Sequence, residues 1–164
     1  MFTGRKVSFF VLIALMIVVA GCITVQMPQY VKDKNPYRKE FYANYDKTLL
    51  STIEALQKLG WKITKQENPV VFESDSADAL KAPRQVLLFT NVRQSSMLLS
   101  SRYTTINVLV KENNEKTDVE IRYFSILSTA LRNFEGYEND HFVEKIFNQI
   151  DKVISEQPPV EPKP

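Results

Sequence analysis

The sequence predicts an α+β fold, a two-layer sandwich with two helices covering one face of an antiparallel five-stranded meander. Three observations predict it. One amphipathic stretch begins near residue 44, another lies near the C-terminal end, and short alternating or apolar stretches separated by turn residues run between them. Because the sheet must bury one face, the two helices at the ends of the domain are its available cover.

The first helix is predicted from Asn44 or Asp46, either of which can cap its N-terminus, to about residue 59. Gly60 is a typical residue just past a helix end, and Trp61 after it can fold back on the helix. Apolar-face residues recur at spacings of three and four: Leu49, Thr52, Ile53, Leu56 and Leu59.

Five strands are predicted between the helices. They are a half-buried strand over 61–65, a short one over 70–72, a central one over 85–92, and a hairpin of 103–111 with 119–124. Asn113-Asn114 lies in the turn of that hairpin. The polar stretch 74–83 is predicted as a loop, 93–101 as a linker and 125–137 as irregular.

The last helix is predicted from an N-cap at Asn139, with Asp140 in its first turn, to about residue 155. Its apolar stripe consists of Phe142, Val143, Ile146, Phe147, Ile150, Val153 and Ile154. The Pro-rich stretch 156–164 is predicted to be a disordered tail. The predicted domain therefore covers 44–155, preceded by a tether over 22–43 and a signal peptide over 1–21.

The first 21 residues have the pattern of a secretory signal peptide. Arg5 and Lys6 form a basic start, an apolar run follows to Ala20, and small residues precede Cys22. An uncleaved membrane anchor is the alternative, because the stretch 7–25 is nearly as long as the roughly 20 apolar residues that cross a bilayer.

The four residues Val19, Ala20, Gly21 and Cys22 resemble the lipobox of bacterial lipoproteins. This resemblance implies that a diacylglyceryl group is attached to the Cys22 sulfur, that signal peptidase II cuts before Cys22, and that the new amino group is acylated. Two or more acyl chains give stable anchoring. In hosts that sort lipoproteins by the residue after the cysteine, Ile23 implies the outer membrane, with the domain facing the periplasm.

Composition excludes several classes of protein. Cys22 is the only cysteine, so a lipidated chain has no disulfide and depends on a packed core. The chain has 21 Lys and Arg against 19 Asp and Glu, and the loss of Arg5 and Lys6 with the signal peptide leaves equal numbers. Without a basic surplus, a nucleic acid is not an expected partner.

No catalytic or metal-binding pattern is found, so no enzyme activity, cofactor or metal is expected. His141 is the only histidine, and a zinc site needs three or four ligands. Asp75 and Asp78 lie together in a loop rich in Ser and Ala, which gives no sign of the burial that acid–base chemistry requires. The alternating charges of 118–122 indicate a solvated sheet face or cross-strand pairs.

Two apolar stretches lie in segments otherwise predicted as irregular. One is Met97, Leu98 and Leu99, and the other is Phe124, Ile126, Leu127 and Leu131. Packed together, they would form a lid over the open end of the sheet, which is the favoured interpretation. Exposed together, they would be a contact patch for a partner or for the bilayer surface.

The run from Tyr45 through Leu59-Gly60-Trp61-Lys62-Ile63 resembles a recurrent module of small bacterial lipoproteins and, more distantly, the helix-on-sheet domains of BamC, a lipoprotein of the outer-membrane β-barrel assembly machine. The resemblance implies an envelope scaffold or assembly accessory. We therefore expect a membrane-anchored, non-catalytic binding module for another envelope component, with a protein favoured over a lipid or a glycan. The alternative is a small-ligand or lipid carrier with a cavity between helices and sheet.

Overall fold

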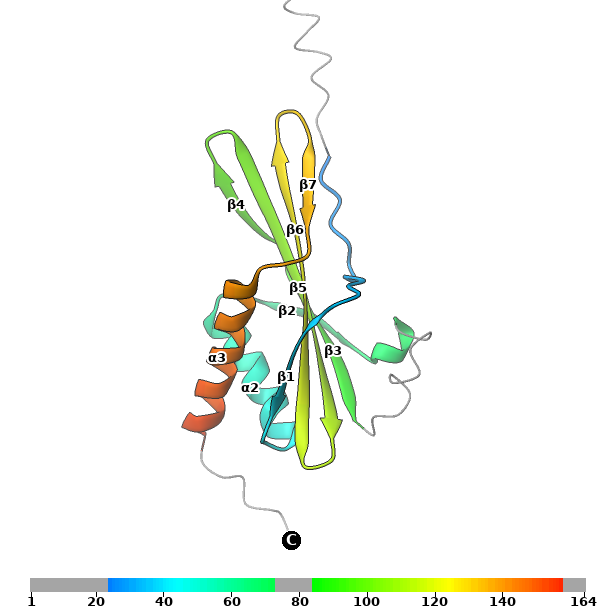
Figure 1. The fold of residues 1–164 in the computed structure, drawn as a ribbon, viewed down its shortest axis with the longest axis vertical. Helices are drawn as coiled ribbons and strands as arrows, with labels where there is room; N and C mark the ends of the chain where they lie inside the picture. Colours follow the sequence, from blue (N-terminus) through cyan, green and yellow to red (C-terminus); the bar gives the residue numbers. More distant parts are fainter. Residues whose placement is uncertain (1–23, 73–83, 158–164) are drawn as a thin grey trace, which may run out of the picture.

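The structure, a computed structural model, describes residues 24–72 and 84–157 (Figure 1). It contains one antiparallel sheet and two α-helices, α2 (Tyr45–Lys58) and α3 (Asp140–Glu156). The predicted α+β class is therefore confirmed. The sheet has seven strands instead of the predicted five: β1 (Tyr37–Phe41), β2 (Ile63–Glu67), β3 (Gln85–Thr90), β4 (Arg93–Met97), β5 (Ser100–Asn113), β6 (Lys116–Thr129) and β7 (Asn133–Gly136).

The sheet is organised around one long hairpin. Its strands β5 and β6 have 14 residues each and pair along their whole length. At the end where β5 turns into β6, β3 and β2 extend the sheet beside β5, and β1 extends it beside β6. At the other end, β4 pairs with β5 and β7 with β6. The second half of the sheet thus projects away from the helices as two adjacent hairpins (Figure 1).

Helix α2 begins and ends where the sequence predicts. The Asn44 side chain accepts a hydrogen bond from the Lys47 N–H at 2.9 Å, which caps the N-terminus. At the other end, Gly60 has a φ of 82°, and the Trp61 N–H reaches back to the Leu56 carbonyl. This is the hydrogen-bond pattern of a helix closed by a left-handed glycine.

Helix α3 also begins at the predicted cap. The Asn139 side chain accepts a hydrogen bond from the Phe142 N–H at 3.1 Å. The Tyr37 hydroxyl of β1 donates to Asp140 and accepts from the Asn139 N–H, so β1 holds the start of α3 in place. Burial and the bond to Asp140 raise the pKa of Tyr37 to about 12.

The main core lies between the helices and one face of the sheet, as predicted (Figure 1). Large side chains with no solvent exposure fill this layer: Leu56, Leu88, Ile106, Val108, Val110, Val119, Ile121, Ile146 and Ile150. They come from both helices and from β3, β5 and β6, so the amphipathic stripes read from the sequence are the ones that the fold buries.

Part of the outer face of the sheet, opposite the helices, is covered by the N-terminal segment of 24–33. Its Val31 is buried with Phe124 and Ile126 of β6, and Val25 and Met27 pack on the same cluster. The Val31 N–H donates to the buried side chain of Asn107 at 2.6 Å. The tether interpretation of 22–43 therefore needs correction, because its described part packs on the sheet and supplies β1.

Three further predictions differ from the structure. Residues 70–72 were expected in a strand, but Pro69–Val71 form a 3₁₀ turn capped by the Asn68 side chain. The predicted linker of 93–101 contains β4, and the irregular segment of 125–137 contains the end of β6 and β7. All five residues of β4 are exposed, so this strand lacks the alternation that would mark it in the sequence.

Candidate functional site

Met97, Leu98 and Leu99 lie at the turn between β4 and β5. Met97 pairs with Ser100, so Leu98 and Leu99 form a two-residue loop between the strands. The exposed fraction is 60% for Met97, 97% for Leu98 and 83% for Leu99. Three large apolar side chains thus stand in solvent at the end of a hairpin.

Leu131 occupies the equivalent place on the neighbouring hairpin, between β6 and β7, and is 90% exposed. The side chain of Thr129 organises this turn by accepting hydrogen bonds from the N–H groups of Leu131 and Arg132. Ser100 lies opposite Thr129 in the β5–β6 register, so the two turns leave the sheet side by side. We call Met97, Leu98, Leu99 and Leu131 together the apolar tip.

The lid interpretation was wrong, because the two apolar stretches do not pack on each other. Phe124 and Ile126 are buried, but under Val25, Met27 and Val31 of the N-terminal segment. The residues of the apolar tip lie further along the hairpins, beyond this cover. The alternative, that both stretches are exposed together, holds for Met97, Leu98, Leu99 and Leu131, but not for the buried Phe124 and Ile126.

The turn chemistry does not account for the leucines. Two-residue hairpin loops favour Asn, Asp or Gly, which reach a positive φ easily. The β5–β6 turn follows this rule, since its Asn114 has a φ of 55° and is the one non-glycine residue with a positive φ in 24–72 and 84–157. Leu98 and Leu99 neither favour this type of turn nor pack in the core. A contact with something outside the domain therefore explains their presence better.

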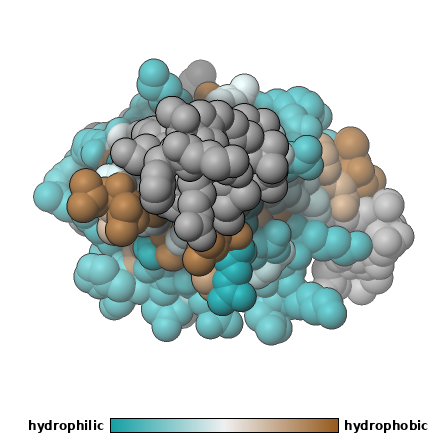
Figure 2. Space-filling model, turned by 90° about the horizontal axis from the view of Figure 1, so that it is seen from above, coloured by the Kyte–Doolittle hydropathy of each residue, from teal (hydrophilic) through white to brown (hydrophobic). Residues whose placement is uncertain are grey.

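The apolar tip lies at the end of the molecule where the described chain begins. Residues 24–27 run beside β7 toward the hairpin ends (Figure 1). Seen from that end, hydrophobic residues appear at several separate places on a surface that is otherwise mostly hydrophilic (Figure 2). Among the described residues, Leu98 and Leu131 are the two most exposed large hydrophobic side chains.

The charges around the tip are mainly basic. Arg102 on β5 and Arg132 in the β6–β7 turn are exposed, and the Arg132 guanidinium stacks on the Phe134 ring at 4.2 Å. Glu135 is the one acidic residue in the two hairpins, 93–102 and 125–136. Sequence analysis did not single out Arg102, Arg132 or Phe134, because the segments that carry them were not predicted as strands.

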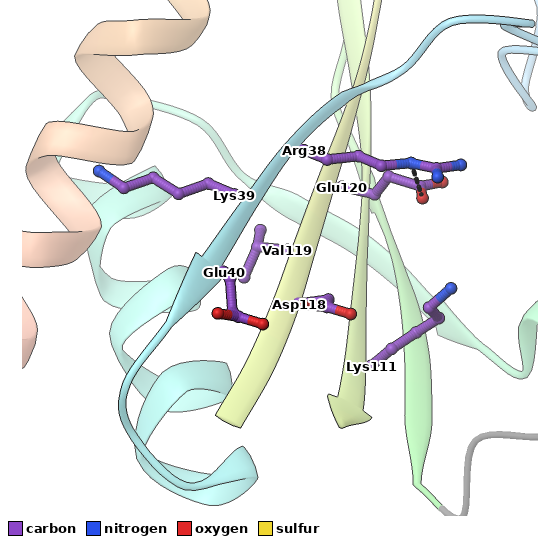
Figure 3. Close-up of a pocket in the computed structure, with 7 residues that line it drawn as sticks. All are labelled: Arg38, Lys39, Glu40, Lys111, Asp118, Val119 and Glu120. Carbon is purple, nitrogen blue, oxygen red and sulfur yellow. Dashed lines mark ion pairs between the residues drawn. The ribbon is translucent and has the colours of Figure 1, made fainter. Parts of the chain in front are cut away.

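Apart from the apolar tip, the structure has a polar hollow on the outer face of the sheet. Its volume is about 210 Å³, and it is lined by residues of β1, β5 and β6 (Figure 3). Arg38 binds Glu120 at 2.8 Å, and Glu120 binds Arg122 at 2.7 Å. Lys39 points the other way, toward α3, where it pairs with Asp151 (Figure 3). These acidic and basic groups neutralise one another, which indicates a structural role.

The solvated-face interpretation of 118–122 was wrong for two of its residues. Glu120 and Arg122 are 5% and 4% exposed. Glu120 pairs with Arg38 of β1, and the Tyr30 hydroxyl of the N-terminal segment accepts a hydrogen bond from Arg122 at 3.0 Å. The cross-strand alternative is confirmed, since Arg38 lies directly opposite Glu120.

The other candidate catalytic or metal-binding residues do not form a site in the described part of the chain. His141 is exposed on the first turn of α3, as expected of a surface residue. Within 24–72 and 84–157, no three His, Cys, Asp or Glu side chains are placed to hold a metal ion. Val19, Ala20, Gly21, Cys22 and the loop with Asp75 and Asp78 lie outside the described residues, as do 158–164.

Neither described helix is long and apolar enough to cross a bilayer. Comparison of the chain with protein-family models finds no match, and comparison with curated proteins finds none either. The arguments for function therefore depend on the sequence and on the geometry of the apolar tip.

Proposed function

We propose that this protein is a bacterial envelope lipoprotein, anchored through a lipid on Cys22, whose domain is a non-catalytic binding module for another envelope component. The apolar tip is the binding surface. The observation that carries the proposal is the exposure of Met97, Leu98, Leu99 and Leu131 on two adjacent turns. The domain faces the periplasm, and Ile23 after the cysteine favours the outer membrane.

The position of the N-terminal segment supports this proposal. Val25 already packs on the sheet, only three residues after Cys22. A lipid on Cys22 would therefore hold the domain close to the membrane, with no long spacer between them. A domain held in this way meets the components at or in the membrane first, and it meets them with the end that carries the apolar tip (Figure 1).

The filled core speaks against the alternative of a ligand carrier. A carrier of this architecture needs a cavity between helices and sheet, of roughly 300 Å³ or more for a drug-sized ligand. In the described structure, fully buried side chains from α2, α3, β5 and β6 occupy that layer. The hollow of about 210 Å³ lies at β1 and on the outer face, and it is lined mostly by charged side chains.

Two measurements test the proposal. Mass spectrometry of the mature protein from bacterial membranes should find Cys22 as the N-terminal residue with a diacylglyceryl group on its sulfur. Cys22→Ser should lose the mass of the diacylglyceryl group and keep residues 1–21, because the resemblance implies that the cut before residue 22 depends on the lipidated cysteine. An unmodified Cys22, or a Cys22→Ser variant with the same N-terminus as the native protein, would contradict the anchor.

The binding surface is tested by a photo-crosslinking residue at position 98 in native membranes, with the same residue at exposed Leu50 of α2 as the matched control. We expect position 98 to capture an envelope component and Leu50 to capture much less. Equal capture at the two positions would contradict the apolar tip as the contact surface.

A further inference from the structure

We infer that the envelope component bound by the apolar tip is the lipid bilayer that holds the anchor. The four side chains of the tip insert into the membrane interface and fix the orientation of the domain. This inference rests on the proposed lipid at Cys22 and deepens the proposed function, because it names the partner as a lipid surface.

The covalent chain limits how far the membrane can lie from the domain. Val25 is held on the outer face of the sheet by Phe124 and Ile126 of β6. Val25 is only three positions after Cys22. A fully extended chain spans at most about 3.5 Å per residue, so the Cys22 Cα stays within about 10 Å of the Val25 Cα.

The hairpins extend over a similar distance beyond the cluster that holds Val25. From Ile126, β6 continues for three residues to Thr129, a rise of about 10 Å, before the turn that carries Leu131. The β4–β5 turn lies beside it, since Ser100 pairs with Thr129. Both turns and the first described residues lie at one end of the molecule (Figure 1). A bilayer close enough to hold Cys22 is therefore within reach of the apolar tip.

The side chains of this end suit the membrane interface. Leu98, Leu99 and Leu131 can enter the hydrocarbon boundary, while Arg102 and Arg132 remain at the level of the headgroups, where anionic lipids attract them. Open strand edges cannot enter the hydrocarbon, because their unpaired backbone groups would lose water. Insertion is therefore limited to the tip side chains, at the shallow depth typical of interfacial proteins.

The shape of the tip favours a bilayer over a protein partner. The tip is the projecting end of two hairpins, and it presents four apolar side chains (Figure 1). A specific protein interface buries roughly 800 Å² per partner and needs a complementary surface. A fluid lipid surface accommodates a small projecting tip without a preformed pocket.

Insertion of the tip into the bilayer sets the orientation of the domain. Helices α2 and α3 cover the half of the sheet formed with β1, β2 and β3, so a membrane-inserted tip holds both helices away from the bilayer (Figure 1). Two points of attachment, the lipid and the tip, allow much less rotation of the domain than the lipid alone.

The experiment uses the full lipidated chain in vesicles of phosphatidylethanolamine and phosphatidylglycerol that contain a nitroxide-labelled lipid. Cys22 is the only cysteine, so after lipidation an introduced cysteine is the only thiol available for an environment-sensitive fluorophore. Leu98→Cys reports on the tip, and Leu50→Cys on α2 is the control. Both side chains are exposed, so neither change should unfold the domain.

We expect the label at position 98 to shift its emission to the blue and to lose about half or more of its intensity to the nitroxide lipid, as a probe at interfacial depth should. The label at position 50 should keep the emission wavelength of a label exposed to water. A label at position 131 should also be quenched, and less so when Met97, Leu98 and Leu99 are replaced by Ser.

Three results would overturn the inference, and they separate it from the proposed function. A lipidated, vesicle-bound protein whose position 98 stays in water would overturn bilayer insertion and leave the anchor intact. Capture of one defined protein from position 98 in native membranes, together with an unquenched label in vesicles, would replace the bilayer with a protein partner. An unmodified Cys22 would remove the anchor and the inference together.

Discussion

At the residue scale, the outer face of the sheet depends on a buried group of charges. Arg122 lies between Glu120, at 2.7 Å, and the hydroxyl of Tyr30, at 3.0 Å. Arg38 approaches Glu120 from β1 at 2.8 Å, with its own side chain largely exposed. A buried charge is stable only with its partners, so each member of this group depends on the others.

Arg122→Met should lower the free energy of unfolding by about 3 kcal/mol, because it leaves the buried Glu120 carboxylate with Arg38 alone. Glu120→Leu combined with Arg122→Met should recover most of this loss, since both members of the buried ion pair are then replaced by apolar side chains. Urea denaturation followed by circular dichroism measures both. A double variant less stable than the single one would contradict the pairing argument.

The raised pKa of Tyr37 makes the free energy of unfolding depend on pH in the alkaline range. Its pKa is raised to about 12 in the folded protein by burial and by the hydrogen bond to Asp140, against about 10 in an unfolded chain. The neutral phenol therefore favours the fold. Its contribution is fully present below pH 10 and is lost as the pH rises from 10 to 12.

The difference in unfolding free energy between the native protein and Tyr37→Phe should be about 1 kcal/mol at neutral pH, the usual value of a lost hydrogen bond. It should shrink between pH 10 and 12. Urea denaturation over this range measures it, and tyrosinate absorbance should show one late-titrating group fewer in the variant. A difference that does not change with pH would contradict the assignment of the raised pKa.

At the scale of elements, the N-terminal segment of 24–33 behaves as part of the domain. It has no regular secondary structure, and its hold on the sheet comes from Val31, which is 1% exposed and whose N–H donates to the Asn107 side chain. Asn107 also binds the Gln29 carbonyl at 3.4 Å. One buried amide thus attaches the segment at two points of its backbone.

Asn107→Ala should detach the segment locally and cost about 1–3 kcal/mol, because the buried Val31 N–H loses its acceptor. Hydrogen exchange with mass spectrometry should show faster exchange in 24–33, while the core of α3 keeps its protection. As a control, Asn91→Ala removes an exposed side-chain acceptor for the Lys62 N–H and should leave 24–33 unchanged. Unchanged exchange in 24–33 of Asn107→Ala would contradict the attachment.

At the scale of the whole molecule, the long β5–β6 hairpin divides the protein into two halves with different energetics. The half under the helices holds the main core, and the projecting half ends in exposed apolar side chains (Figure 1). Stability should therefore be sensitive to substitutions in the first half and insensitive to substitutions at the apolar tip.

Replacing Met97, Leu98 and Leu99 together with Ser should change the free energy of unfolding by less than about 0.5 kcal/mol, because these side chains contact little of the domain. Ile150→Ala, which empties a fully buried position of α3, should cost about 2–5 kcal/mol. Urea denaturation of the two variants, in the same preparation, makes the comparison. A similar loss in both would place the tip in the core.

The sequence by itself determined the α+β class, both helices and the central hairpin. Their signals are local: Asn44 and Asn139 cap the helices within three residues, Gly60 ends α2, and apolar periodicity marks the buried faces. Strands near β2 and β3 were also predicted, whereas only the tertiary structure decided β1, β4 and β7, the cover on the outer face and the exposed tip. β1 pairs with a strand some 80 residues away, β4 is exposed on both sides, and the turns that carry Leu98 and Leu131 are neighbours only through the β5–β6 register. Contacts between distant parts of the chain give no periodic pattern of apolar residues in either part. Such a pattern shows which face of a segment is buried, but not which distant segment packs against it.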